Sequence, residues 1–294
     1  MKTSILGALL CLLVLALSTQ AAATTPGSPV VTLKIVTLNL YHDKDDWPKR
    51  RPQIVEKLKE LRPDVIALQE VLQHQTLTNQ AQWLADQLGY QWHFVSIDPA
   101  GSARRYGNAL LTRHPILKRD HALLEPLDDS RTAGLLRIDL GGRPVNVYVT
   151  HLHWTDGGGA IRSRQIAELM RFIDKTAENV PSVVAGDFNS SADSPELAAL
   201  RESWVDVYGT LHPQVDAVAS STLNLKYFAP RRIDHIFYER KAFVPLQAKI
   251  LFDHPDAQGI WASDHFGVLA ELGLTSIQTQ NTGRGPATGN TSPE

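Results

Sequence analysis

Side chains that can carry acid, base or metal chemistry recur at the polar ends of apolar runs in this 294-residue sequence. They are carboxylates, carboxamides and imidazoles, namely Asn39, Glu70, His151, Asp187, Asn189, Asp234, Asp264 and His265. The backbone at a strand end is rigid and the side chains there are open to solvent, so sheets commonly carry their binding and catalytic sites at strand ends. We therefore interpret these residues as one shared pocket.

Each of these residues also has a structural interpretation when it is taken alone. Asn39 fits a buried amide that bridges two strands, and the segment GDFNS fits a turn, because Asp, Asn and Ser bond to their own backbone. His151 and His153 lie two residues apart, so they share one face of a strand, where a histidine is often structural. A shared pocket is preferred because it explains all of the residues together.

The donor types in this pocket favour a hard divalent cation. Mg²⁺ prefers carboxylates and retained water to a closed protein cage, whereas zinc sites draw on several histidines or cysteines. The single cysteine, Cys11, lies in a segment that we expect to be removed. Thiolate ligands and thiol nucleophiles are therefore excluded from the mature chain.

The N-terminus has the three zones of a secretory signal peptide. A lysine precedes the apolar run ILGALLCLLVLAL, and the segment STQAAA follows it. This run is too short for a membrane span, which needs about 20 apolar residues. We predict a signal peptide over residues 1–23 and a secreted or periplasmic protein. Lipid attachment at Cys11 is disfavoured, because Leu10 stands where a small residue is expected.

Composition divides the remaining chain into one domain and two flanking segments. Residues 24–30 are rich in Pro, Gly, Ser and Thr and predict a linker, and residues 275–294 have almost no apolar side chains and predict a disordered tail. The folded unit is expected over residues 31–274, enough chain for one large core. The net charge of −2 gives no support for a wide basic surface, although a local basic groove is compatible with it.

Composition and periodicity indicate the elements that position the pocket. Runs of aliphatic and β-branched residues predict strands over residues 33–40, 64–71, 108–112, 134–140, 144–152, 182–189, 232–238 and 266–272. Apolar residues at helical spacing predict helices over 51–61 and 160–176, and a third helix is expected within 77–90, ended by Gly89. Many strands with few helices predict an α/β fold of two packed sheets with helices outside.

Seven short motifs, taken in order, resemble the endonuclease/exonuclease/phosphatase superfamily, as a secreted bacterial-type, deoxyribonuclease I-like member. The motifs are TLNL, LQEV, YGNALLT, THLH, GDFN, RIDHIF and SDH. The resemblance covers about residues 31–272, and GDFN together with SDH is the specific combination. The resemblance implies a four-layered α/β sandwich, in which two central, mainly antiparallel β-sheets are flanked by helices.

The resemblance also implies a role for each residue of the metal and base side. Glu70 matches the metal-ligand glutamate, Asn39 an asparagine at the edge of metal and phosphate, and Asp264 the last metal-side carboxylate. His265 matches the general base, and Asp234 the carboxylate that orients it. Such a partner keeps an imidazole useful near neutral pH.

The remaining residues match the phosphate side of the family's site. Asp187 and Asn189 match the pair that orients the attacking water and holds a phosphate oxygen. His151 matches the histidine that contacts the scissile phosphate and can protonate a leaving oxygen. Together the resemblance implies hydrolysis of a phosphomonoester or phosphodiester with Mg²⁺ or Mn²⁺ as cofactor.

The sequence departs from the family pattern at three places. Phe266 and Gly267 follow SDH where many relatives have a proline. Deoxyribonuclease-like members support the His151-type residue with a glutamate, and we assign no equivalent glutamate here. Asp43 or Asp45 is a candidate ligand for a second metal, but both lie in a polar loop, which favours a solvated interpretation.

Two alternatives from other classes compete with a phosphoesterase. The segment THLHWTDGG resembles the zinc signature of metallo-β-lactamase-like hydrolases, but Asp156 is one residue late and Gly157 stands where a histidine should be. This alternative also leaves GDFN and SDH unused. The other alternative is a non-catalytic extracellular binding module, in which the Asp and His residues are only structural.

The phosphate contacts and the substrate follow from weaker signals. The guanidinium group of arginine can bond to two phosphate oxygens at once. The candidate phosphate contacts are Arg105, Tyr106, Asn108 and Arg131, and Arg104, Arg231 and Arg232 are further candidates. Their alternative is a solvated basic surface. A phosphate ester is the expected partner, with nucleic acid, lipid headgroup and small phosphoester left open, although the charge slightly favours the last two. No obligate protein partner is expected, and the protein is predicted to be a monomer.

Overall fold

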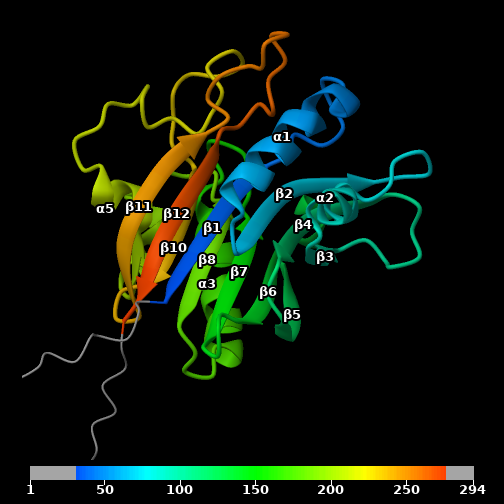
Figure 1. Cartoon of the computed structure of the whole chain (residues 1–294). Coiled ribbons are helices and arrows are strands. Elements are labelled where there is room, and N and C mark those ends of the chain that lie inside the picture. The colour runs from blue at the N-terminus through cyan, green and yellow to red at the C-terminus, as the bar shows by residue number, and fades with distance from the viewer. Residues whose placement is uncertain (1–30, 276–294) are drawn as a thin grey trace, which may run out of the picture.

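Two six-stranded β-sheets pack face to face in the computed structural model, which describes residues 31–275 (Figure 1). In spatial order, the first sheet contains β11 (Phe243–Leu251), β12 (Gly267–Leu274), β1 (Thr32–Asn39), β2 (Val65–Gln73), β4 (Arg105–Thr112) and β3 (Gln91–Ser96). The second contains β5 (Ile116–Leu124), β6 (Arg131–Asp139), β7 (Pro144–His151), β8 (Ser182–Asp187), β10 (Asp234–Glu239) and β9 (Trp204–Asp206). Neighbouring strands are antiparallel except for the pairs β1/β2 and β7/β8.

Helices cover the outer faces of both sheets. They are α1 (Trp47–Leu61), α2 (Gln80–Leu88), α3 (Gly159–Thr176), α4 (Ala198–Arg201) and α5 (Val207–Leu211), with 3₁₀ turns at Leu127–Asp129 and Pro195–Leu197. One apolar core lies between the sheets, a second lies under α1 and α2, and a third lies under α3. The predicted four-layered α/β sandwich with mainly antiparallel sheets is therefore confirmed.

The predicted elements are confirmed in type, and their bounds shift by a few residues. All eight predicted strands and all three predicted helices are present, but α1 begins at Trp47, where a proline occupies the first turn. Gly89 ends α2 with φ of 69°. β3, β5, β9 and β11 were not predicted. The predicted signal peptide, the linker and all of the predicted tail except Thr275 lie outside the described residues.

A buried arginine on α1 ties two loops together at one end of the sandwich. Arg50 is 1% exposed, and its guanidinium donates to the carbonyls of Leu40, Tyr41, His42, Lys44 and Ala262 at 2.6–3.3 Å. These carbonyls belong to the loop after β1 and to the segment before β12. Arg50 therefore holds both segments in place through backbone contacts.

Over residues 31–275, no helix is both long enough and apolar enough to cross a membrane.

Candidate active site

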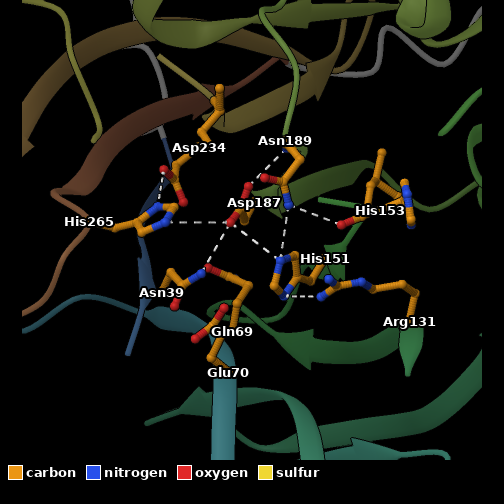
Figure 2. Close-up of polar contacts among 12 residues, drawn as sticks. Asn39, Gln69, Glu70, Arg131, His151, His153, Asp187, Asn189, Asp234 and His265 are labelled. Carbon is orange, nitrogen blue, oxygen red and sulfur yellow. Dashed lines mark hydrogen bonds and ion pairs between the residues drawn. The ribbon is translucent and has the colours of Figure 1, made fainter. Parts of the chain in front are cut away.

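Strand ends from both sheets meet at a cleft of about 910 Å³. The register places His151 beside Asp187 across β7 and β8, and Asp187 beside Asp234 across β8 and β10. Asn39 ends β1 in the facing sheet, and its Nδ2 donates to Oδ2 of Asp187 at 3.1 Å. Figure 2 shows Asp187 at the centre of these contacts, so the predicted pocket residues of the two sheets meet there.

His265 and Asp234 form a buried hydrogen-bonded pair. Nδ1 of His265 lies 2.9 Å from Oδ2 of Asp234, and Nε2 lies 3.9 Å from Oδ2 of Asp187. Burial alone lowers the pKa of His265, but the carboxylates of Asp234, Asp187 and Asp264 raise it well above its usual value. The imidazole is therefore strongly basic, and its bond to Asp234 leaves Nε2 facing the cleft.

Ser263 anchors the turn that carries this pair. Its hydroxyl donates to the carbonyl of Asn39 at 2.7 Å and accepts from the N–H of His265 at 3.2 Å. The carbonyl of Asp264 accepts from the N–H of Asn224 at 2.9 Å. The SDH motif is thus fixed to β1 on one side and to a long loop on the other.

The GDFN segment forms a turn and also faces the cleft. Oδ1 of Asp187 accepts from the N–H of Asn189 at 2.9 Å, and Asn189 has a φ of 49°. Burial, and then the nearby charge of Asp234, raise the pKa of Asp187 to about 7. The structural interpretation of this segment as a turn is therefore compatible with a place in the pocket.

An arginine contacts the ring of His151 inside the cleft. Nη1 of Arg131 lies 2.9 Å from Nδ1 of His151, and Nε2 of the same ring lies 3.4 Å from Oδ2 of Asp187. Nδ2 of Asn189 lies 3.2 Å from Nε2. Burial, and then the charge of Arg131, lower the pKa of His151 well below its usual value, so the ring is neutral near pH 7.

Glu70 reaches the cleft through an irregularity in β2. The pairing of β2 with β4 is interrupted between Leu68 and Val71, and Glu70 has a φ of 56°. Its Oε2 lies 2.6 Å from Nε2 of His42. Burial raises the pKa of Glu70, but the contact with His42 and the other nearby groups together lower it by more than burial raises it. The net pKa of Glu70 is therefore below its usual value. His42 was not predicted, because it lies in a polar loop without a recognisable pattern.

The pocket around Glu70 offers the donors that a hard cation takes. Asp264 also lines the cleft, and burial together with the charge of Glu70 raises its pKa to about 6. Mutual repulsion between two carboxylates is what a bound divalent cation relieves. Asn39 adds an amide oxygen, which accepts from the N–H of Tyr41 at 3.0 Å. These residues therefore fit a magnesium-type site.

A second group of ligand-type atoms lies beside this pocket. Atoms of Asp187, Asp234 and His265 lie within 4.8 Å of one another. Oδ2 of Asp234 already accepts from Nδ1 of His265, so a metal bound there would use Oδ1 of Asp234, which is buried without a hydrogen-bond partner in the described part of the chain. The bond between Asp234 and His265 itself has the arrangement of an acid–base pair.

The predicted phosphate contacts divide into two groups. Tyr106 and Arg131 line the cleft. Arg105 does not line it, since its Nε donates to the carbonyl of Asp98 at 3.2 Å and its guanidinium lies over the ring of Phe94. Asn108 does not line it either, since its Nδ2 donates to Thr132 on the facing sheet.

The three further arginines considered as phosphate contacts also divide into two groups. Arg104 and Arg231 line the cleft, and Arg231 also pairs with Asp156 at 3.0 Å. Arg232 points elsewhere, because it bonds to Asp206 at 2.6 Å. The cleft therefore has a local basic rim.

The loop residues considered for other metals are engaged in separate contacts. His153 bonds to Asp129 at 2.8 Å and to Thr155 at 2.7 Å, so both of its ring nitrogens are occupied. A zinc site on His151 and His153 would have to break these bonds and the contact with Arg131. Asp43 pairs with His74, and Asp45 accepts from a tyrosine hydroxyl.

The fold and the site agree with the family found by sequence comparison. The profile of the Endonuclease/Exonuclease/phosphatase family matches residues 36–265. The chain therefore belongs to this family.

Curated relatives include two eukaryotic proteins and one bacterial protein. A probable RNA exonuclease of Schizosaccharomyces pombe is 27% identical over 52% of this chain and 33% of its own length. Nocturnin of Drosophila melanogaster is 25% identical over 78% of this chain and 42% of its own length. The uncharacterized protein YbhP of Escherichia coli is 25% identical over 54% of this chain and 67% of its own length. The chain thus spans less than half the length of the first two.

Solved structures share the fold at lower identity. A D. rerio TDP2 structure with a single-strand DNA product has a TM-score of 0.69 at 20% identity, covering 82% of this chain and 98% of that one. The human Nocturnin catalytic domain with a bound sulfate anion has a TM-score of 0.66 at 22% identity, covering 83% of this chain and 94% of that one.

Proposed function

We propose that this protein is a metal-dependent phosphoesterase that hydrolyses a phosphodiester or phosphomonoester bond. One observation carries the proposal: a basic imidazole paired with a carboxylate, a neutral imidazole and an oxygen-rich pocket all converge on Asp187 in one cleft. A buried carboxylate in a cleft, with its pKa raised to about 7, is typical of catalytic sites and favours an enzyme over a non-catalytic module.

In the proposed reaction, His265 takes the proton of the attacking water. Asp234 holds the ring so that Nε2 faces the cleft and stabilises the imidazolium that forms. Asp187 and Asn189 orient the water and a phosphate oxygen, and His151 donates to another phosphate oxygen. The oxygen of the water forms a bond to phosphorus, and the P–O bond to the leaving group breaks with both electrons on the leaving oxygen.

Glu70, Asn39 and Asp264 are the residues that would hold the cation. A divalent ion supplies charge neutralisation on the phosphate and on the leaving oxygen. We propose Mg²⁺ or Mn²⁺, because the donors are oxygen atoms and a thiolate is absent from residues 24–294.

For the substrate, we propose a phosphate ester of nucleic-acid or nucleotide type. Support comes from the names of the relatives, which include an RNA exonuclease and a neighbour bound to single-strand DNA. The local basic rim of Arg104 and Arg231 and the exposed rings of Trp154 and Phe228 fit such a ligand. A lipid headgroup or small phosphoester is the second candidate, favoured by the net charge of −2.

A substrate panel tests this proposal. Purified protein is assayed with Mg²⁺, Mn²⁺ or Ca²⁺ on plasmid and single-stranded DNA, RNA, sphingomyelin, phosphoinositides and bis-p-nitrophenyl phosphate. We expect metal-dependent cleavage of at least one substrate, lost in Glu70→Ala, Asp187→Ala and His265→Ala. The matched control is Arg119→Gln, an exposed residue of β5 outside the cleft. Full activity in EDTA would overturn the metal-assisted reaction.

We further propose that the protein acts outside the cytoplasm as a monomer without an obligate protein partner. The support is the signal-peptide pattern of residues 1–23 and the completeness of the cleft within one chain.

A further inference from the structure

The surroundings of His151 restrict which of its ring nitrogens carries a proton. A guanidinium has five N–H donors and no acceptor. Because Nη1 of Arg131 lies 2.9 Å from Nδ1 of His151, this nitrogen can only accept. A neutral imidazole has one N–H and one acceptor nitrogen, so the proton of His151 must lie on Nε2.

The contacts of Nε2 agree with this assignment. Oδ2 of Asp187 lies 3.4 Å from Nε2 and can accept its proton. Nδ2 of Asn189 lies 3.2 Å from Nε2 and donates one of its two N–H groups to the carbonyl of Leu152 at 3.0 Å, so its second N–H competes with Nη1 of Arg131 for the acceptor nitrogen of the ring. Both ring nitrogens cannot accept at once, and the shorter contact, from a charged donor, is the one to Nδ1.

A buried network holds Arg131 in this position. Asp129 lies 3.5 Å from Nε of Arg131, and its Oδ2 also accepts from His153 at 2.8 Å and from Gln165 at 3.2 Å. Arg131 itself is 5% exposed. The carboxylate that pairs with Arg131 is therefore held by residues of two other segments, while Nε of the buried guanidinium has no hydrogen-bond partner of its own within residues 31–275.

We propose that Arg131 is a positioning residue that holds His151 as the neutral Nε2–H tautomer, so that His151 donates a hydrogen bond to a phosphate oxygen and does not protonate the leaving oxygen. The proposal deepens the function proposed above and rests on it for the identity of the ligand. Without a protonating His151, the leaving oxygen departs as an oxyanion and takes its proton from water in the open cleft. Esters with weakly basic leaving oxygens, such as aryl esters, are then cleaved faster than alkyl esters.

The charges that face His151 support the neutral form. Arg131 approaches from β6, Asp187 from β8, His265 from the turn before β12 and His42 from the loop after β1. Burial and Arg131 outweigh the single carboxylate, so the pKa of His151 is well below its usual value.

The first test observes the tautomer directly and requires no activity. Protein labelled with ¹⁵N-histidine is studied by long-range ¹H–¹⁵N correlation NMR near pH 7 in EDTA, and the His151 signals are assigned with His151→Gln. We expect an unprotonated Nδ1 and a protonated Nε2. In Arg131→Glu, whose carboxylate accepts where the guanidinium donated, we expect the proton to move to Nδ1. Arg119→Gln is the control and keeps the wild-type signals.

Two results would overturn the proposal. One is an Nδ1–H signal for His151 in the unmodified protein, which needs no variant to fold. The other is an unchanged His151 spectrum in a folded Arg131→Glu protein. Because the tautomer is read without substrate, this failure is distinct from a failure to find phosphoesterase activity.

The second test separates a hydrogen-bond donor from a proton donor. Values of kcat/KM are measured on p-nitrophenyl phosphate esters and on esters with more basic leaving groups. His151→Gln keeps an N–H donor, so we expect a loss smaller than the roughly 10²-fold that removal of a general acid causes, with an unchanged dependence on the leaving group. A His151→Gln enzyme whose kcat/KM falls much more for alkyl esters than for aryl esters would contradict the proposal.

Discussion

Single residues of the cleft are held in charge states that differ from those of exposed groups. Burial, and then a neighbouring carboxylate, raise the pKa values of Asp187 and Asp264, whereas burial lowers the pKa of His265 and the surrounding carboxylates more than offset this. His151 has a lowered pKa because it is buried beside Arg131. The pKa values of the two imidazoles in one cleft are thus shifted in opposite directions, and such a separation is typical of groups with different acid–base roles.

The pair of His265 and Asp234 predicts the pH dependence of activity. A base acts in its neutral form, so a raised pKa of His265 moves the ascending limb of kcat/KM toward higher pH. Asp234→Asn removes a main cause of that rise. We therefore expect the ascending limb of kcat/KM for Asp234→Asn to lie at lower pH than that of the unmodified protein. We also expect kcat/KM of this variant to be reduced about 10²-fold or more. Superimposable limbs at saturating Mg²⁺ would show that Asp234 does not set this pKa.

Asp187 predicts a pH dependence of stability. Its pKa rises from 3.8 in the unfolded chain to about 7 in the fold, so the folded protein holds an extra proton between these values. The stabilisation is fully present below pH 3.8 and is lost as the pH rises through about 7. In EDTA, the Tm of Asp187→Asn relative to the unmodified protein should therefore increase from pH 4 to pH 8. Asp86→Asn on the exposed face of α2 serves as the control, and a pH-independent difference for Asp187→Asn would contradict the shift.

The sequence predicted the pocket better than the phosphate contacts. Residues at strand ends could be grouped because their polarity interrupts apolar runs. Arg105 and Asn108 were misplaced because β4 begins at Arg105, three residues before its predicted start. Strand alternation then turns Arg105 away from Tyr106, and Asn108 lies deeper on the same face as Tyr106, against Thr132.

Whole elements show why the prediction of the fold was incomplete. The four strands that were missed, β3, β5, β9 and β11, are the four edges of the two sheets. Edge strands are exposed along one side, so they carry alternating polar residues or a proline, as in β5 and β11. Central strands are continuous apolar runs and are recognisable. The bulge at Glu70 has no sequence signal, because the motif LQEV has the composition of a regular strand.

The close approach of β7 and β8 predicts the effect of a single methyl group. A Cβ on Gly186 would lie 2.0 Å from the carbonyl oxygen of Thr150, which is backbone and cannot turn aside. Gly186→Ala should therefore push β8 away from β7, displace Asp187 and cost about 1–3 kcal/mol of stability. Urea unfolding and kcat measure the two effects. Gly101→Ala is the control, since nothing lies within 4 Å of its added Cβ. A Gly186→Ala protein with unchanged stability and unchanged kcat would refute the packing argument.

At the scale of the whole molecule, both sheets are needed to complete the cleft. Asn39 and Glu70 come from the first sheet, and His151 and Asp187 from the second.

The segment before the folded unit carries the prediction about location. When the full chain is expressed in a bacterium with its N-terminus intact, we expect periplasmic or secreted protein that begins at Thr24. N-terminal sequencing checks this, and an unprocessed cytoplasmic chain beginning at Met1 would exclude the signal peptide.

Arg50 has a consequence for the order of folding and cation binding. Many small metal sites form only when the ion arrives, so removal of the ion unfolds them. Here a permanent guanidinium already fixes the loop after β1 and the segment before β12 through five carbonyls. The binding pocket should therefore exist before the ion enters, and calorimetric titration with Mg²⁺ should show binding without the large heat-capacity change of coupled folding. In Arg50→Lys, which cannot reach all five acceptors, binding and local ordering should become one event.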